Sequence, residues 1–330
     1  MMSGNIESIF RNVALLLAVV YTASSCSFPE KPCPEEPKTT VRAEISLDIT
    51  LPGTAEDIVP DGAYTRRFIV EAAETNGASA TRAEYIEEDI TATKYSRKIT
   101  MTLRPGEYTL TVWSDYSAGT GDLLYDTSSL RTVTFAGPYT ACNNAKDAFA
   151  GSTTLDLRPY KGQAAEIETT LNLSRAVGRY EIVTTDADLF RKHLGEGKIE
   201  GSSFTLRLTC DGLLACGYNC VDALRKELFS GKSYTVALPA AEEIGGPETL
   251  LCFDYCLCAP GEKLDIPMTA ALLDGQGRVV ALSRISVPLS NGMNTRVYGR
   301  FLTAYTEGGI IIDPSFDNTV HIDLGTLTPR

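Results

Sequence analysis

Apolar and polar residues alternate along most of the chain, with a period of two that predicts β-strands. The first such strand carries Ala43, Ile45, Leu47 and Ile49 on one face. Similar runs, bounded by turn residues, predict further strands at 66–72, 129–135, 165–173, 179–184, 203–210, 233–238, 249–258, 264–273, 278–287, 294–302 and 319–324. So many short strands predict an all-β fold of sandwiches or barrels.

A tight turn at residues 104–107 (RPGE) separates two of the clearest strands. We interpret residues 98–116 as a β-hairpin, because a short turn with Pro and Gly between two alternating runs is typical of one. The alternating apolar residues are Ile99, Met101, Leu103, Tyr108, Leu110 and Val112, and the one tryptophan of the chain, Trp113, is out of phase with them.

Helical signals are few and short. Residues 186–194 (DADLFRKHL) begin with acidic residues and end with basic ones, and residues 221–229 (VDALRKELF) predict a second helix. The stretch 136–153 is rich in Gly, Ala, Asn and Ser, which predicts a long loop with one helical turn. We place a domain boundary near residues 172–178, where one strand-rich region passes directly into the next.

The first residues of the chain predict an export signal. Arg11 precedes a short apolar run at 13–20 (VALLLAVV), and small residues then lead to Cys26. A helix needs about 20 apolar residues to cross a bilayer, and this run is much shorter. The layout predicts a lipoprotein signal peptide at 1–25, cleaved before a cysteine that carries a diacylglyceryl group. The alternative is an ordinary secretory signal with an incidental cysteine.

Residues 26–40 predict a tether, because prolines alternate there with charged residues and such a composition buries no core. The remaining chain exceeds the usual size of one domain, so we expect two domains, at 41–174 and 175–330. The net charge of −12 argues against nucleic acid and anionic membrane surfaces as partners, because both require clustered Lys and Arg. Attachment to the membrane is therefore expected through the lipid on Cys26.

Six segments of the chain resemble the fimbrillin and fimbrial-anchor lipoproteins of Bacteroidales-type bacteria and their relatives of unassigned function. The resemblance covers most of the chain after the signal peptide, and the order of the segments contributes to it. The segments are 104–116 (RPGEYTLTVWSDY), 137–151 (GPYTACNNAKDAFAG), 174–186 (SRAVGRYEIVTTD), 217–235 (GYNCVDALRKELFSGKSYT), 250–260 (LLCFDYCLCAP) and 300–317 (RFLTAYTEGGIIIDPSFD).

This resemblance implies two tandem antiparallel β-sandwiches, transthyretin-like in fold, with a few short helices. It also implies a stalk, anchor or tip component of surface fimbriae. In polymerising members of these families, a strand of one subunit completes a sheet of its neighbour, since the unpaired backbone groups of an edge strand can template an incoming strand.

The chain departs from the family pattern in two ways. Many relatives have Arg followed by Pro near the domain junction, whereas this chain has Arg175 and Ala176, and it is richer in cysteine. The resemblance further implies arginine-specific proteolysis near the N-terminus, for which Arg42, Arg66 and Arg67 are candidate sites. A subunit that anchors a fimbria to the cell would keep its lipid and avoid that cut.

Eight cysteines occur besides Cys26: Cys33, Cys142, Cys210, Cys216, Cys220, Cys252, Cys256 and Cys258. If 250–258 is one strand, Cys252, Cys256 and Cys258 share a face with Asp254, while Leu251, Phe253, Tyr255 and Leu257 share the other. We expect small buried thiols or disulfides, because disulfides are allowed in an exported chain and a grouping with Cys210, Cys216 or Cys220 is geometrically possible. Zinc is the alternative, although paired C-x-x-C spacing is absent.

The chain offers few residues for catalysis. Of its two histidines, His193 lies late in the first predicted helix and His321 lies in the last predicted strand. Asp186 and Asp188 are expected to cap that helix rather than form a hydrolytic pair. A turn, with cation binding as the alternative, is expected at Asp313, Asp317 and Asn318, and a bulge or turn rather than a phosphate loop at Gly308 and Gly309.

Aromatic residues leave a second function open. Tyr108, Trp113 and Tyr116 could stack on sugar rings, but on a strand such rings more often belong to the core. We therefore expect a non-catalytic lipoprotein of a Gram-negative outer membrane, exposed at the cell surface. It is expected to act as a fimbria or pilus component, or as an adhesin, with fimbrial subunits or other surface proteins as partners. The alternative is a glycan-binding lipoprotein. We expect no cofactor, metal or catalytic residues, with Cys26 as the one modified site.

Overall fold

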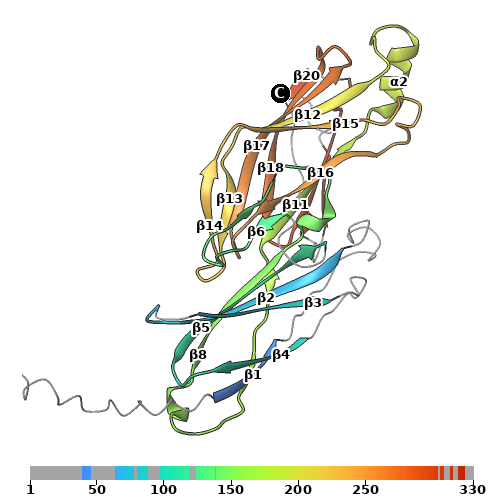
Figure 1. Cartoon of the computed structure of the whole chain (residues 1–330). Coiled ribbons are helices and arrows are strands. Elements are labelled where there is room, and N and C mark those ends of the chain that lie inside the picture. The colour runs from blue at the N-terminus through green and yellow to red at the C-terminus, as the bar shows by residue number, and fades with distance from the viewer. Residues whose placement is uncertain are drawn as a thin grey trace, which may run out of the picture.

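The computed structural model describes residues 39–45, 64–77, 80–87, 97–118, 124–137, 139–303, 305–307, 313–314 and 319–323. Within these residues the strands form five sheets and α2 is the one α-helix, so the all-β class is confirmed. Figure 1 shows β1 to β5 and β8 in the lower part of the view, and β6 together with the labelled strands of the second half in the upper part. In the part of the chain described, no helix has the length and hydropathy needed to span a bilayer.

Two of the sheets are built from the first half of the chain. One has the order β4 (Arg97–Leu103), β1 (Thr39–Ile45) and β9 (Glu168–Thr170). The other has the order β10 (Ser174–Arg175), β8 (Phe149–Asp156), β5 (Glu107–Ser117), β2 (Thr65–Glu74) and β3 (Ala80–Glu87). Their pairings are antiparallel except for β1 with β9.

A hydrophobic core lies between these two sheets because each presents the apolar residues of its alternation to the other. Val41 and Met101 are paired across β1 and β4. They belong to one buried cluster with Phe68 and Val70 of β2 and with Leu110 of β5. Val41 of β1 is buried in this core, whereas the side chains of the predicted face, Ala43, Ile45, Leu47 and Ile49, lie outside the described part of the structure.

The predicted hairpin at 98–116 is wrong, although both of its strands exist. β4 pairs with β1, whereas β5 pairs with β2 and β8, so the turn at 104–107 carries the chain from one sheet to the other. Ile99 and Leu110 then face each other across the core instead of lying side by side in one sheet. Alternation identifies a strand and its buried face but says nothing about its partner, and a short turn serves both geometries.

Two further sheets are built from the second half of the chain. One has the order β16 (Thr249–Leu257), β11 (Val177–Thr184), β19 (Asn294–Gly299), β22 (Thr319–Asp323) and β21 (Asp313–Pro314). The other has the order β15 (Lys232–Ala237), β12 (Phe204–Cys210), β17 (Lys263–Asp274), β18 (Val279–Ser290) and β20 (Tyr305–Glu307). Their antiparallel pairs are joined by parallel ones, β11–β19, β19–β22 and β18–β20.

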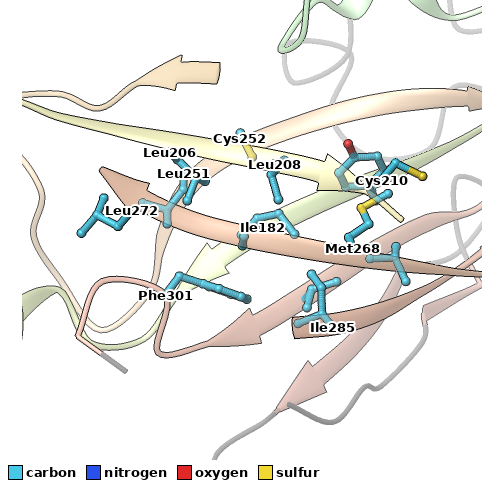
Figure 2. Packing of buried hydrophobic residues seen from close by; sticks show 14 of the residues in the cluster. Ile182, Leu206, Leu208, Cys210, Leu251, Cys252, Met268, Leu272, Ile285 and Phe301 are labelled. Atoms are coloured by element: carbon cyan, nitrogen blue, oxygen red, sulfur yellow. The ribbon is translucent and has the colours of Figure 1, made fainter. Parts of the chain in front are cut away.

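The core between these two sheets is the largest buried cluster of the described residues. Figure 2 shows Ile182, Leu206, Leu208, Met268 and Ile285 in it. Cys210 and Cys252 pack among these aliphatic side chains as small apolar residues. These two sheets therefore form a second β-sandwich, as the sequence predicts.

A fifth sheet joins strands from both halves of the chain. Its order is β14 (Leu224–Phe229), β13 (Leu214–Asn219), β7 (Val133–Phe135) and β6 (Tyr125–Asp126). A third buried cluster, which includes Trp113, Tyr125, Tyr218 and Tyr255, packs at this place. Because this sheet crosses the predicted boundary, the division into domains at 41–174 and 175–330 stays a proposal.

The helix predictions have different outcomes. α2 (Ala187–Gly195) confirms the first predicted helix, and the short 3₁₀ helix η2 (Asn144–Lys146) is the expected helical turn. The second predicted helix is wrong, since 224–229 forms β14. Its helix-favouring residues are overridden by pairing with β13. The predicted loop 136–153 also ends early, because β8 begins at Phe149.

Candidate interaction site

The segment 139–148 lies between β7 and β8 in sequence, and it makes hydrogen bonds and ion pairs with strands of both halves of the chain. Toward the second half, the backbone N–H of Cys142 donates to the carbonyl of Phe253 at 3.0 Å, and the Tyr255 hydroxyl donates to the Asn144 side chain at 3.0 Å. Toward the first half, the Asp147 carboxylate binds the Arg175 guanidinium at 3.0 Å. The Asn143 side chain accepts from the N–H of Ala145 and so holds the 3₁₀ turn in place.

Buried charges define the middle of this segment. The Lys146 ammonium lies 2.6 Å from the Asp254 carboxylate, which also accepts a hydrogen bond from the Tyr139 hydroxyl, and both charged side chains are almost fully buried. Burial raises the pKa of the Asp254 carboxyl, and the Lys146 ammonium opposes this effect. A buried pair costs desolvation energy that its partners must offset, so this pair tolerates the loss of neither member.

Arg66 and Arg67 are both fully buried in β2. The Arg67 guanidinium binds both carboxylate oxygens of Asp115, at 2.8 and 2.7 Å, and Arg66 lies 3.8 Å above the Tyr116 ring. A protease could reach either arginine only after the interior strand β2 had unfolded. The folded structure therefore disfavours processing at these two sites, whereas Arg42 on β1 is exposed.

An ion pair, turn hydrogen bonds and pairing with β7 fix the position of the hairpin formed by β13 and β14. The Arg225 guanidinium binds the Glu262 carboxylate through two contacts of 2.7 and 2.6 Å, and this ion pair lowers the pKa of Glu262. In the turn, the Asn219 side chain accepts from the N–H groups of Val221 and Asp222. β13 also pairs with β7, so the hairpin has a fixed position.

The outer edge of β14 is open in the described structure, because no described strand pairs with it. Along β14, Leu224, Lys226, Glu227 and Leu228 are exposed, while Arg225 and Phe229 are partly buried. Leu224 and Leu228 are 50% and 49% exposed, and Leu213, just before β13, is 57% exposed. We call Leu213, Leu224, Lys226 and Leu228 together the β14 edge. Figure 1 shows β13 and β14 side by side at the margin of the molecule.

An exposed apolar edge strand is the surface that proteins normally avoid, because its unpaired N–H and C=O groups can bind another strand. The edge strand β3 of the first half also carries charged residues, and its Arg82 lies close to both Glu71 and Glu84. Leu250 and Val279 are the remaining strongly exposed large apolar residues of the described chain, and neither lies on this hairpin.

The predicted cysteine faces are confirmed in β16. Cys252, Cys256 and Cys258 pack in the core of the second sandwich, while Tyr255 and Leu257 pack in the third cluster. Leu251 is the exception and joins Cys252, at a bulge in the pairing of β16 with β11. The described cysteines are free thiols: Cys142, Cys210, Cys216, Cys220, Cys252, Cys256 and Cys258. Burial raises the pKa of Cys210 to about 11 and that of Cys258 to about 12.

The residues considered for catalysis and metal binding remain apart. His193 lies in the last turn of α2 and His321 in β22. Asp186 occupies the N-cap of α2, but its carboxylate accepts from Thr184 and Thr303 instead of capping the helix. Across the described ranges, no cluster of three or more His, Cys, Asp or Glu side chains is arranged to hold a metal ion.

Some predicted sites lie outside the described residues, namely Cys26, Cys33, Gly308, Gly309, Asp317 and Asn318. Asp313 lies in β21, which pairs antiparallel with β22. The rings considered for sugar stacking are all buried: Tyr108 is 3% exposed and Trp113 and Tyr116 are 0% exposed. A glycan platform made of these three rings is therefore wrong, because none of them reaches the surface.

These features define an all-β protein of stacked sheets with an open apolar edge. The chain belongs to the family described as "Family of unknown function (DUF6562)", whose model matches residues 29–327. Among curated proteins, none matches the chain.

Solved structures of fimbrial proteins are similar in fold. A fimbrial assembly protein from Parabacteroides distasonis has 14% identity and a TM-score of 0.46, over 88% of this chain and 100% of that chain. The fimbrial anchor protein Mfa2 from Porphyromonas gingivalis has 13% identity and a TM-score of 0.46, over 87% of this chain and 98% of that chain. The chain is thus similar to fimbrial proteins, as the sequence resemblance predicts. At such low identity, its function must be inferred from its own residues.

Proposed function

We propose that this protein is a non-catalytic surface lipoprotein that takes part in a fimbria-type assembly by adding a strand of a partner protein to β14. The observation that carries the proposal is the open β14 edge, on which two leucines are about half exposed in an otherwise well-packed hairpin. Strand addition supplies backbone hydrogen bonds along the edge, and the leucines supply apolar contacts with the incoming side chains.

The rigid support of the edge favours this role. The inner side of the hairpin is bound through Arg225 to Glu262 and through β13 to β7. An edge that is fixed in advance loses little conformational entropy when a partner binds. The alternative role in glycan binding lacks support, since the aromatic rings considered for it are buried.

Changing both exposed leucines of the edge to lysine, in the variant Leu224→Lys/Leu228→Lys, should abolish assembly while leaving the fold intact. Two charges on the edge would have to be desolvated against a partner strand, as in natural edge strands that resist pairing. We expect the amount that co-purifies with surface fibres sheared from cells to fall by about tenfold or more.

The matched control is Val279→Lys, which places the same charge on another exposed residue, in a strand with neighbours on both sides. Normal co-purification of the double variant would rule out the β14 edge. Repeated absence of the unaltered protein from such fibres would overturn the assembly role itself.

The lipid anchor is a separate part of the proposal, which rests on the signal-peptide layout before Cys26. Cys26→Ala should abolish labelling of the protein with a radioactive fatty acid, because the thiol that accepts the lipid is gone. Cys33→Ala serves as the control and should be labelled normally. Labelling that persists in Cys26→Ala would refute attachment at this residue.

A further inference from the structure

A pocket of about 260 Å³ lies below the β13–β14 hairpin. Three parts of the chain form its walls: the segment around Phe135 and Tyr139, the hairpin through Leu214 and Phe229, and β16 through Tyr255. The Phe135 and Tyr139 rings lie 6.4 Å apart in an edge-on arrangement, and Phe135 also stacks on Tyr125. Ring packing therefore shapes the pocket without any ligand.

The two lysines that line this pocket differ in their partners. Lys146 is neutralised by Asp254 at 2.6 Å. Lys232 contacts the faces of two aromatic rings, with its Nζ 4.8 Å from the centre of the Tyr139 ring and 5.9 Å from that of Phe229. Within the described residues, no carboxylate lies at ion-pair distance from Lys232. The pocket of this strongly acidic protein thus has an uncompensated positive charge at an apolar wall.

The size of the pocket limits what it can hold. Sites for drug-sized ligands usually have volumes of roughly 300–1,000 Å³, and this pocket is smaller. One large side chain fits such a volume, and apolar pockets of this kind hold the anchor residues that dominate many protein interfaces. Phe229, which lines the pocket, is the last residue of β14, so the pocket adjoins the proposed strand-addition edge.

We propose that this pocket receives one aromatic or branched apolar side chain of the partner protein, with an adjoining carboxylate of that partner paired to Lys232. The apolar walls favour an apolar side chain of the partner. The Lys232 ammonium, which has no carboxylate partner within the described residues, favours an acidic residue next to that side chain. This inference rests on the proposed function, because it names the chemistry of the partner segment that binds next to β14.

Two small probes test the pocket directly on the purified mature chain. N-acetyltryptophan carries an aromatic side chain and a carboxylate, whereas N-acetyltryptophanamide has the same ring without the charge. Dissociation constants from saturation-transfer NMR should show that the carboxylate probe binds about fivefold more tightly, the upper range for a partly exposed ion pair. Lys232→Met should abolish this preference and Lys232→Arg should retain it.

Lys263→Met is the matched control, because Lys263 is an exposed lysine of β17 that belongs neither to the pocket nor to the β14 edge. It should leave the preference unchanged. Failure of both probes to bind, or a preference that persists in Lys232→Met, would overturn the pocket proposal. These measurements need no fibres, so a negative result here leaves the test of the β14 edge standing, and the reverse is also true.

Discussion

Replacing Asp254 with leucine is expected to lower the free energy of unfolding by about 3–5 kcal/mol, the cost of leaving one member of a buried ion pair without its partner. Leucine fills a similar volume, so the loss comes from the Lys146 ammonium, which would stay buried without its contact of 2.6 Å, and from the Tyr139 hydroxyl. Urea unfolding followed by far-UV circular dichroism measures the change.

A second readout is available because Trp113 is the one tryptophan of the chain and lies in the buried cluster beside this ion pair. Its fluorescence should report the same unfolding midpoint as circular dichroism if the buried cluster around Trp113, here called the junction, unfolds together with the sheets. An earlier fluorescence transition in Asp254→Leu would show that the junction opens first.

The double variant Lys146→Met/Asp254→Leu is the control for the buried pair. Replacing both charges with apolar side chains should restore most of the lost stability, since such replacements are often neutral. If the double variant were as unstable as Asp254→Leu, the unpaired ammonium would not be the cause. Glu168→Leu breaks the exposed contact with Lys98 and should cost less than about 1 kcal/mol.

Trp113→Ala is expected to destabilise the protein by about 3–5 kcal/mol, the usual cost of removing a large buried aromatic side chain. The Trp113 ring packs edge-on to Tyr125 at 5.1 Å and lies 6.1 Å from Tyr218, and these tyrosines belong to β6 and β13. Its indole N–H also donates to Asp115 at 3.1 Å. The variant would leave a cavity between strands from both halves of the chain.

Thermal and urea unfolding by circular dichroism measure this effect, with Leu250→Ala as the comparison. Leu250 is 48% exposed, so its truncation should change the free energy of unfolding by no more than about 0.5 kcal/mol. A loss below about 1 kcal/mol for Trp113→Ala would mean that the shared sheet contributes little to stability.

Several elements followed directly from local pattern. The alternation around Ile99 and Leu110 marked two strands and their buried faces, and the period of two in β16 separated Cys252 and Cys256 from Tyr255 and Leu257. The acidic start and basic end of 186–194 marked α2. These predictions depend on neighbours in sequence only, which is why they could be made without the fold.

Other elements could not be predicted because long-range pairing decided them. Residues 224–229 contain good helix formers, yet pairing of Leu224 with Asn219 and of Phe229 with Leu214 makes them a strand. The exposed leucines of the β14 edge were missed for the same reason. Leu224 and Leu228 are four residues apart, which is the spacing of one helix face, so the local pattern favoured a helix here.

The sequence by itself determined the all-β class and most of the strands, because periodicity acts over a few neighbouring residues, whereas lipidation at Cys26 stays a prediction. The tertiary structure alone decided which strands pair, that β7 and β13 share a sheet, and that Lys146 meets Asp254. Lys146 and Asp254 are 108 residues apart in the chain, and no local pattern encodes a contact over that separation.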